Sequence, residues 1–205
     1  MNTNTATSNT PIRSPQAVLK QVFGYKDFRD GQEAIIAAAL DGQDSLVLLP
    51  TGGGKSLCYQ VPALILDGVT VVISPLISLM QDQVAQLRAL GVQAAYINNS
   101  LPFEEQQAVY QQLHYGQIKL LYVAPEKVLQ HEFLERLSHL KLALFAIDEA
   151  HCVSHWGHDF RPHYCRLNEL KQRFMHVPMM ALTATADKAT RYDIIEQLQL
   201  NHPYV

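Results

Sequence analysis

Residues 47–60 read Val-Leu-Leu-Pro-Thr-Gly-Gly-Gly-Lys-Ser-Leu-Cys-Tyr-Gln, and this stretch decides the fold class. The apolar residues 46–49 are typical of a buried strand, and Lys55-Ser56 begins a helical pattern. The three glycines between them let the backbone curl so that its N–H groups point inward. The N-terminus of the following helix adds a partial positive charge. We therefore expect this loop to bind phosphate.

Two side chains of the loop are expected to act on a nucleoside triphosphate. Lys55 would reach the β- and γ-phosphates, and the Ser56 hydroxyl would ligate Mg²⁺. The stretch departs from the strict phosphate-loop pattern, because Leu49 stands where that pattern has its outer glycine. A plain glycine-rich turn before a helix is the alternative interpretation.

The composition indicates one large α/β domain. The chain has 205 residues, of which 48% are hydrophobic and 17% charged, and its net charge is −3. This length allows a sizeable core. Because the net charge is slightly negative, the charge of the chain as a whole does not indicate nucleic-acid binding. Any such contact would be local, through backbone amides, helix N-termini and a few basic side chains.

The cysteine content and the apolar segments predict an intracellular protein, in the cytoplasm, the nucleoid or a nucleus. Three cysteines form no disulfide framework. No apolar run reaches the length of a membrane span, and no signal peptide is recognisable. Residues 1–15 are mostly Thr, Asn, Ser and Pro, so we expect a disordered tail there.

Short apolar segments alternate with helical patterns along the rest of the chain. This alternation predicts an α/β fold, in which a parallel sheet carries helices on both faces. Ligands bind such sheets at the carboxyl ends of the strands. The expected strands are 45–49, 69–74, 93–97, 119–123, 142–148 and 179–184. The expected helices are 31–40, 55–66, 78–90, 103–115, 132–138, 164–174 and 188–198.

A second strand end carries two adjacent carboxylates. The apolar run 144–147 leads directly into Asp148 and Glu149. Asp148 would hold Mg²⁺, directly or through water, and Glu149 would orient and deprotonate the attacking water. An acidic turn at the end of a strand is the simpler alternative. The phosphate loop upstream favours the nucleotide-hydrolysing interpretation.

The chain resembles superfamily two helicases, and within them the RecQ family, over about residues 17–200. The aromatic segment 156–161 directly after the acidic motif is the most selective of the matches. Leu49 is compatible with this family, which does not require the outer glycine. The matching segments are Thr51-Gly52-Gly53-Gly54-Lys55-Ser56, Ser74-Pro75-Leu76-Ile77-Ser78-Leu79, Ala124-Pro125-Glu126, Asp148-Glu149-Ala150-His151-Cys152, Trp156-Gly157-His158-Asp159-Phe160-Arg161 and Ala181-Leu182-Thr183-Ala184-Thr185-Ala186.

This resemblance implies that residues 16–205 form the first RecA-like lobe, the helicase ATP-binding domain, of a P-loop DNA helicase. The implied activity is ATP hydrolysis coupled to 3′–5′ translocation and duplex unwinding in DNA recombination and repair. The implied partners are single-stranded and forked DNA and a second RecA-like lobe, which these residues do not include. That lobe would supply an arginine finger, so we expect this chain alone to bind Mg·ATP and to be nearly inactive.

The resemblance also places the adenine base beside a segment near the N-terminus. Tyr25 would stack on the base, and Arg29 and Gln32 would contact its edge. A side-chain amide can pair with both N6 and N7 of adenine. An aromatic cluster that docks the N-terminal helix is the alternative.

DNA-facing positions are expected at three places. Loop 154–161, here called the aromatic loop, is too polar for a core, and its aromatic side chains could stack on unpaired bases. The turn 74–78 could donate amides and a hydroxyl to a DNA phosphate, although ordinary helix capping also explains it. The strand-end threonines are expected to link the nucleotide site to the DNA path. The candidate residues are Ser74, Ser78, Trp156, Phe160, Arg161, Thr183 and Thr185.

Alternative interpretations remain open at this point. The aromatic loop could be a plain surface cluster, or a zinc site built from Cys152, His155, His158, His163 and Cys165, although that spacing matches no familiar zinc pattern. The whole chain could be a nucleotide-gated DNA-binding module without turnover of its own. It could also be an RNA helicase of the DEAD-box kind, which shares the phosphate loop and the acidic motif.

Overall fold

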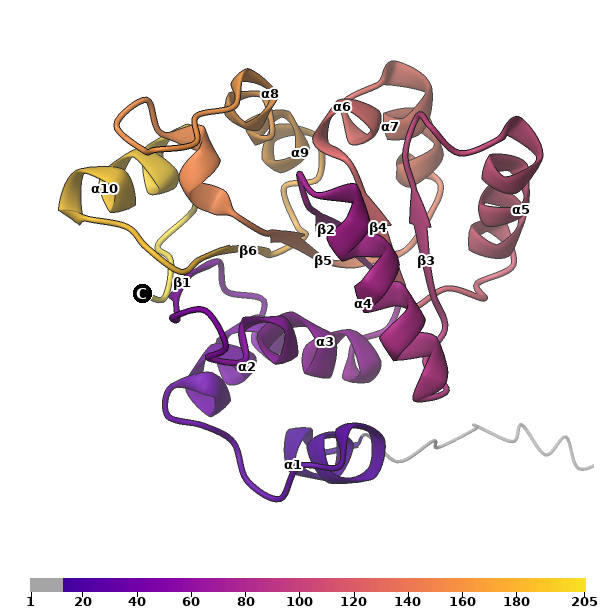
Figure 1. Ribbon diagram of the computed structural model, residues 1–205, viewed down its shortest axis with the longest axis horizontal. Helices are drawn as coiled ribbons and strands as arrows, with labels where there is room; N and C mark the ends of the chain where they lie inside the picture. Colours follow the sequence, from indigo (N-terminus) through magenta and orange to yellow (C-terminus); the bar gives the residue numbers. More distant parts are fainter. Residues whose placement is uncertain (1–12) are drawn as a thin grey trace, which may run out of the picture.

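The computed structural model describes residues 13–205, and its centre is a six-stranded sheet (Figure 1). All neighbouring strands pair in parallel, in the order β1-β6-β5-β2-β4-β3. Each of the six predicted strands is present and is one residue shorter than expected. The strands are β1 Ser45–Leu48, β2 Val69–Ile73, β3 Ala94–Ile97, β4 Leu120–Val123, β5 Leu142–Ile147 and β6 Met179–Thr183.

Helices cover both faces of the sheet, which confirms the predicted α/β fold class. In Figure 1, α2 and α3 lie on one side of the sheet, and α7, α9 and α10 lie on the other. Six of the seven predicted helices agree with the structure within one residue at each end. These six are α2 Gln32–Leu40, α3 Lys55–Ile65, α4 Ile77–Ala89, α5 Phe103–His114, α7 His131–Ser138 and α10 Lys188–Gln197.

The side chains on the two faces of each strand belong to two separate hydrophobic cores. In β2, Val71 and Ile73 pack with side chains of α5, α7 and α10, whereas Val72 packs with α2, α3 and α4. Successive side chains of a strand point to opposite faces, so a strand buried on both sides is predominantly apolar along its whole length. The sequence Val-Thr-Val-Val-Ile of β2 is buried throughout.

The single helix predicted over 164–174 is wrong. The structure has two short helices instead, α8 Pro162–Cys165 and α9 Asn168–Arg173. Tyr164, Leu167 and Leu170 are all buried and recur every three residues. Hydrogen bonds from Leu167 N to Tyr164 O and from Leu170 N to Leu167 O, both 3.1 Å, tighten the backbone to a three-residue turn. The apolar spacing therefore fits the tighter turn better than a continuous α-helix.

The N-terminal segment begins with helical turns that the sequence analysis did not predict. Most of the expected tail, residues 1–12, lies outside the described residues. Ser14 accepts a hydrogen bond from Ala17 N at 3.2 Å and caps α1 Pro15–Val18, which a π-helical turn, Leu19–Phe23, extends. The apolar side chain of Val18 packs against Val61 of α3. Three further short turns are α6 Pro125–Val128, η2 Ala150–Val153 and α8.

A buried carboxylate joins the two ends of the domain. Asp44, 3% exposed, precedes β1 and accepts hydrogen bonds from Lys171 Nζ at 2.7 Å, Met179 N at 2.9 Å and Asn201 N at 2.7 Å. These partners belong to α9, to the start of β6 and to the segment after α10. Three donors compensate the desolvation of one carboxylate. Asp44 therefore fixes β1 against the C-terminal third of the chain.

We predict that Asp44→Ala strongly destabilises the domain. The substitution leaves the Lys171 ammonium and two backbone amides buried without their acceptor, which costs about 3–5 kcal/mol. Urea unfolding followed by circular dichroism measures the change. The matched control is Asp67→Ala, which breaks the exposed ion pair between Asp67 and Lys141 and should leave the midpoint almost unchanged. Equal midpoints for the two variants would contradict the role of Asp44.

Candidate functional site

The candidate site lies along the carboxyl edge of four adjacent strands. The phosphate loop follows β1, Thr183 ends β6, Asp148 follows β5 and Ser74 follows β2, and these strands are neighbours in the order β1-β6-β5-β2. Segments that are more than 100 residues apart in the sequence are thus brought to one edge. This is the edge at which parallel α/β sheets bind their ligands.

The phosphate loop depends on its glycines. Gly52 and Gly54 have φ angles of 77° and 79°, in the left-handed region that disfavours other residues. A Cβ on Gly53 would lie 2.8 Å from the Pro50 carbonyl oxygen, so only glycine fits there. Lys55 is the first residue of α3, and its Nζ donates to the Leu49 carbonyl at 3.3 Å. Thr51 is exposed at the tip of the loop.

Arg29 and Gln32 hold the phosphate loop directly. The Gln32 amide is buried, donates to Gly54 O at 3.1 Å and accepts from Arg29 N at 2.8 Å. The Arg29 guanidinium donates to Gly52 O. A Cβ on Gly54 would lie 2.3 Å from Gln32 Nε2, so the third glycine makes room for this contact. The two residues expected at the adenine edge are therefore bonded to the loop in this structure.

A cavity of about 500 Å³ opens beside the phosphate loop. Its wall includes Tyr25, Gly54 and Ser56, together with Gln60 and Gln83. Tyr25 is 54% exposed, so its ring is available for stacking. Three of the nucleotide residues expected from the sequence thus border one cavity, which is of the size that small-molecule sites have.

The carboxylate pair lies in two different environments. Asp148 is 8% exposed, and burial together with the neighbouring Glu149 raises the pKa of its carboxyl to about 6. Glu149 is more exposed, and its backbone has φ 51° and ψ 45°. A left-handed conformation is strained for a glutamate and is held here by the turn that follows β5. The positive charge of Lys55 partly offsets this rise in the pKa of Asp148.

His151 connects the acidic motif to β6. Its Nδ1 lies 2.9 Å from Thr183 Oγ1 and 3.4 Å from Glu149 Oε2. The Thr183 hydroxyl donates its own hydrogen to Thr185 O at 3.1 Å, so Nδ1 must be the donor toward Thr183. Burial lowers the pKa of His151, which keeps the ring neutral. The sequence analysis did not assign this role, although the position two residues after Glu149 was a usable signal.

The aromatic loop is anchored at its base and exposed at its tip. Ser154 Oγ donates to Asp193 Oδ2 at 2.6 Å and accepts from Trp156 N at 3.2 Å. Trp156 itself is 79% exposed, whereas the Phe160 ring stacks on His155 with the ring centres 3.9 Å apart. The Arg161 guanidinium pairs with Asp159 at 3.4 Å.

The aromatic loop also contacts the acidic motif, through two of its residues. The rings of His158 and His151 stack with their centres 4.8 Å apart. Gly157 approaches the His151 carbonyl so closely that a Cβ there would lie 2.9 Å from its oxygen. Trp156 lies two residues before His158. The ring of His158 stacks on His151, and His151 in turn contacts Glu149.

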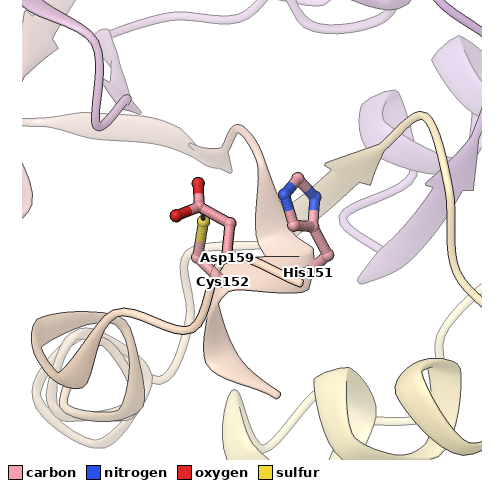
Figure 2. A group of neighbouring side chains, drawn as sticks. All are labelled: His151, Cys152 and Asp159. Atoms are coloured by element: carbon pink, nitrogen blue, oxygen red, sulfur yellow. Dashed lines mark hydrogen bonds between the residues drawn. The ribbon is translucent and has the colours of Figure 1, made fainter. Parts of the chain in front are cut away.

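The proposed zinc ligands do not gather. Within residues 13–205, the group of potential ligand atoms that does come together is His151, Cys152 and Asp159, all within 4.8 Å of one another. Figure 2 shows the Cys152 sulfur beside the Asp159 carboxylate. Each of the three already has a protein partner, and burial raises the pKa of the Cys152 thiol to about 12. The structure accounts for this cluster by hydrogen bonding alone.

The remaining DNA-facing candidates occupy the same edge. Ser74 is buried and its Oγ accepts from Leu76 N at 3.4 Å, while Ser78 lies exposed in the first turn of α4. Thr183 is buried and Thr185 is exposed. The N-cap of α4 is Leu76 and has no side-chain cap, so Ser74 does not cap this helix, and the Ser78 side chain is exposed.

Two contacts at the site were not foreseen from the sequence. Gln83 Nε2 donates to Ser56 Oγ at 3.3 Å, and Tyr164 Oη donates to Asp148 O at 2.9 Å. Both residues lie far from their partners in the sequence, so no local pattern connects them. Only the glutamine-rich face of α4 was a signal, and it also fits a solvated helix.

The fold and this site define a helicase domain. The family model for DEAD/DEAH box helicases matches residues 29–194, and the chain belongs to that family. None of the helices in the described part of the chain combines the length and the apolarity of a membrane span.

Relatives narrow the class and confirm the resemblance to RecQ helicases. The chain is 60% identical to the ATP-dependent DNA helicase RecQ of Pasteurella multocida over 188 residues, which cover 92% of this chain and 30% of that protein. It is 58% identical to RecQ of Haemophilus influenzae, over 95% of this chain and 32% of that protein. The chain therefore spans about a third of the length of these curated relatives.

Solved helicase structures share the fold. The DUF1998 helicase MrfA, in a crystal structure bound to DNA, superposes with a TM-score of 0.73 at 20% identity, over 93% of this chain and 28% of that one. The helicase domain of Hef from Pyrococcus furiosus gives a TM-score of 0.65 at 22% identity, over 86% of this chain and 37% of that one. The predicted RecA-like fold is thus confirmed.

We predict that Asp148→Asn stabilises the unliganded protein at neutral pH. A folded-state pKa of about 6, against 3.8 for an ordinary aspartate, means that the folded protein binds this proton more tightly than the unfolded chain. Stability is then lost as the pH rises between these two values and stays lost above them. The asparagine avoids this loss, which is at most about 3 kcal/mol.

Urea unfolding at several pH values measures this difference. The advantage of Asp148→Asn should be full at pH 7.5 and should shrink by about half near pH 5. Asp82→Asn, an exposed position on α4, is the control and should show no such pH dependence. An advantage that did not change with pH would contradict the assignment of the shift to Asp148.

Proposed function

We propose that this chain is the ATP-binding lobe of an ATP-dependent DNA helicase of the RecQ type. The observation that carries the proposal is the shared strand edge, on which Lys55, Asp148 and Glu149 lie together and His151 joins them to the aromatic loop. A phosphate loop alone would indicate only nucleotide binding. A phosphate loop linked to an exposed tryptophan indicates hydrolysis that responds to a stacked base.

The residues present fit Mg·ATP. The glycine loop offers a cradle that a Cβ at Gly53 would fill, and Ser56 and Asp148 are the hard oxygen donors that Mg²⁺ prefers. A bound Mg²⁺ would supply positive charge against the charge that develops on the phosphates. Lys55 binds the phosphates as a point charge, and Ser56 and Asp148 are the residues that would hold the ion.

Hydrolysis requires a base that reaches water. Glu149 serves this role better than Asp148, because it is the more exposed of the pair and its Oε2 lies 3.4 Å from His151 Nδ1. His151 orients the carboxylate and is itself held by Thr183. This is the arrangement in which a base is positioned by a third group.

The adenine base is placed in the cavity beside Tyr25. Stacking on the Tyr25 ring would hold its face, while Gln32 and Arg29 would recognise its edge. Gln32 and Arg29 now bond to Gly54 and Gly52, so adenine recognition would exchange these contacts and loosen the phosphate loop. Nucleotide identity and loop conformation are thereby coupled.

Single-stranded and forked DNA are the proposed substrates. Trp156 and Phe160 would stack on bases, Arg161 would contact phosphate, and Ser74, Ser78 and Thr185 would line the same path. Thr183 passes the DNA signal to His151. A DNA substrate places the protein at the nucleoid or in the nucleus, in DNA recombination and repair.

The relatives favour this proposal over its rivals. They are DNA helicases by name, and this chain spans about a third of their length, which leaves room for a second RecA-like lobe in proteins of that kind. That lobe is the proposed partner and would supply an arginine finger for 3′–5′ translocation. The alternative, an RNA helicase of the DEAD-box kind, would lack an aromatic loop of this form.

We predict that Lys55→Ala and Glu149→Gln separate binding from turnover. Lys55→Ala removes the main charge that meets the phosphates, so binding of a fluorescent ATP analogue should be lost. Glu149→Gln keeps the shape but is not a base, so affinity should persist while hydrolysis in the two-lobed protein falls by at least about 10²-fold. Parent-like hydrolysis by Glu149→Gln would show that another group is the base. Affinity retained by Lys55→Ala would remove the phosphate-loop assignment.

We also predict that Trp156→Ala uncouples DNA from ATP hydrolysis. Stacking of a base on an aromatic ring is worth about 1–3 kcal/mol, so affinity for single strands should fall moderately. Stimulation of hydrolysis by single-stranded DNA should be lost, because the signal to His151 begins at this loop. The assay compares hydrolysis with and without DNA in the two-lobed protein.

The control for this experiment is Phe103→Ala. Phe103 is 75% exposed and Trp156 is 79% exposed, so the two aromatic side chains are similarly accessible. Phe103, however, begins α5, which contacts the edge strand β3. It should leave stimulation intact. Equal behaviour of the two variants would reduce the aromatic loop to a surface cluster.

A further inference from the structure

A polar network runs beneath the phosphate loop and uses a residue with no assigned role. Gln83 of α4 donates through Nε2 to Ser56 Oγ at 3.3 Å and accepts from Tyr59 Oη at 2.8 Å. Tyr59 Oη also lies 3.2 Å from Tyr122 Oη, which accepts from Gln60 Nε2 at 3.2 Å. The network thus joins α3, α4 and β4.

We infer that Gln83 is a positioning residue that orients the Ser56 hydroxyl for the cation of the bound nucleotide. The inference rests on the proposed function and extends it to a residue outside the motifs. A serine hydroxyl rotates freely, so a ligand role requires a neighbour that fixes its lone pairs. Gln83 is the side chain that donates to this hydroxyl.

Gln83 is itself held in one orientation. Its Oε1 is occupied by the Tyr59 hydroxyl, which is fully buried, and burial raises the pKa of Tyr59 so that it stays a neutral donor. Because the tyrosine fixes one end of the amide, the other end presents its N–H groups to Ser56. A rotamer fixed by buried partners is what positioning of a ligand requires.

The position of Gln83 on α4 gives the contact a further consequence. Helix α4 begins at Ile77, inside the turn 74–78 that we propose to face DNA, and Gln83 lies about 9 Å further along its axis. A helix moves as a rigid element. A DNA phosphate that pulls on this turn would therefore shift Gln83 against Ser56, and it would do so without the aromatic loop.

The test is the magnesium dependence of nucleotide binding, measured with a fluorescent ATP analogue at fixed concentration while Mg²⁺ is titrated. Gln83→Leu should raise the Mg²⁺ concentration at half-maximal binding by about threefold to tenfold, the effect of one lost neutral hydrogen bond. Binding in excess EDTA should be unchanged. The matched control is Gln81→Leu, an exposed glutamine of α4 outside the lining of the cavity beside Tyr25, and it should leave the midpoint unchanged.

A second variant keeps the test decisive if Gln83→Leu fails to fold. Tyr59→Phe preserves the packing and removes the hydroxyl that donates to Gln83 and also contacts Tyr122, so it should shift the Mg²⁺ midpoint in the same direction by a smaller factor. The double variant should shift it no further than Gln83→Leu alone, because the two residues act in one chain of contacts.

The outcomes distinguish a failure of the inference about Gln83 from a failure of the proposed function. Parent-like midpoints for Gln83→Leu or, where it does not fold, for Tyr59→Phe would overturn this inference and leave the proposed function standing. A midpoint shift equal to that of Gln81→Leu would do the same. A parent chain without any magnesium-dependent binding would overturn the proposed function, and this inference with it.

Discussion

Parallel strand pairing is the constraint on which the rest of this structure depends. Every neighbouring pair in the sheet is parallel, so all six carboxyl ends lie at one edge and both faces must be covered by helices. Because the carboxyl ends share one edge, the phosphate loop, Thr183, the carboxylate pair and Ser74 lie near one another although they are distant in the sequence. Because helices cover both faces, β2 and β4 are buried at every position. Site and core are therefore two results of one hydrogen-bonding pattern.

The phosphate loop is held in place by polar contacts from other parts of the chain. Gln32 and Arg29 bond to the carbonyls of Gly54 and Gly52, and Lys55 bonds to that of Leu49. The Gln32 amide is buried, and leaving it without these partners would cost more than a typical hydrogen bond contributes. In the proposed binding mode, a nucleotide that engages Gln32 and Arg29 would have to replace these contacts. The raised pKa of Asp148 also favours binding of a cation. A carboxylate that is shielded from water is stabilised most by a nearby positive charge.

The sequence predicted the strands to within one residue and six of the helices, since each is a short apolar or amphipathic run bounded by turns. It missed what depends on partners distant in the chain. Tyr164, Leu167 and Leu170 read as one helix, but their spacing of three suits a tighter turn that packs under Asp148. Gln83 looks like a solvated helix residue until α3 is placed beside it. His151 was counted among the residues of the acidic motif, yet its bond to Thr183 spans 32 residues and follows only from the neighbouring positions of β5 and β6.

Two separate routes lead from the proposed DNA path to the nucleotide site, and they reach different functional groups. The first runs from the aromatic loop through the stacked rings of His158 and His151 to Glu149, which is the proposed base. The second runs from the turn 74–78 along α4 through Gln83 to Ser56, a proposed cation ligand. A base acts on turnover, whereas a cation ligand acts on nucleotide affinity. A strand of DNA that contacts both surfaces could thus set binding and hydrolysis separately. Because the two routes share no residue, their effects on the nucleotide site should be close to additive.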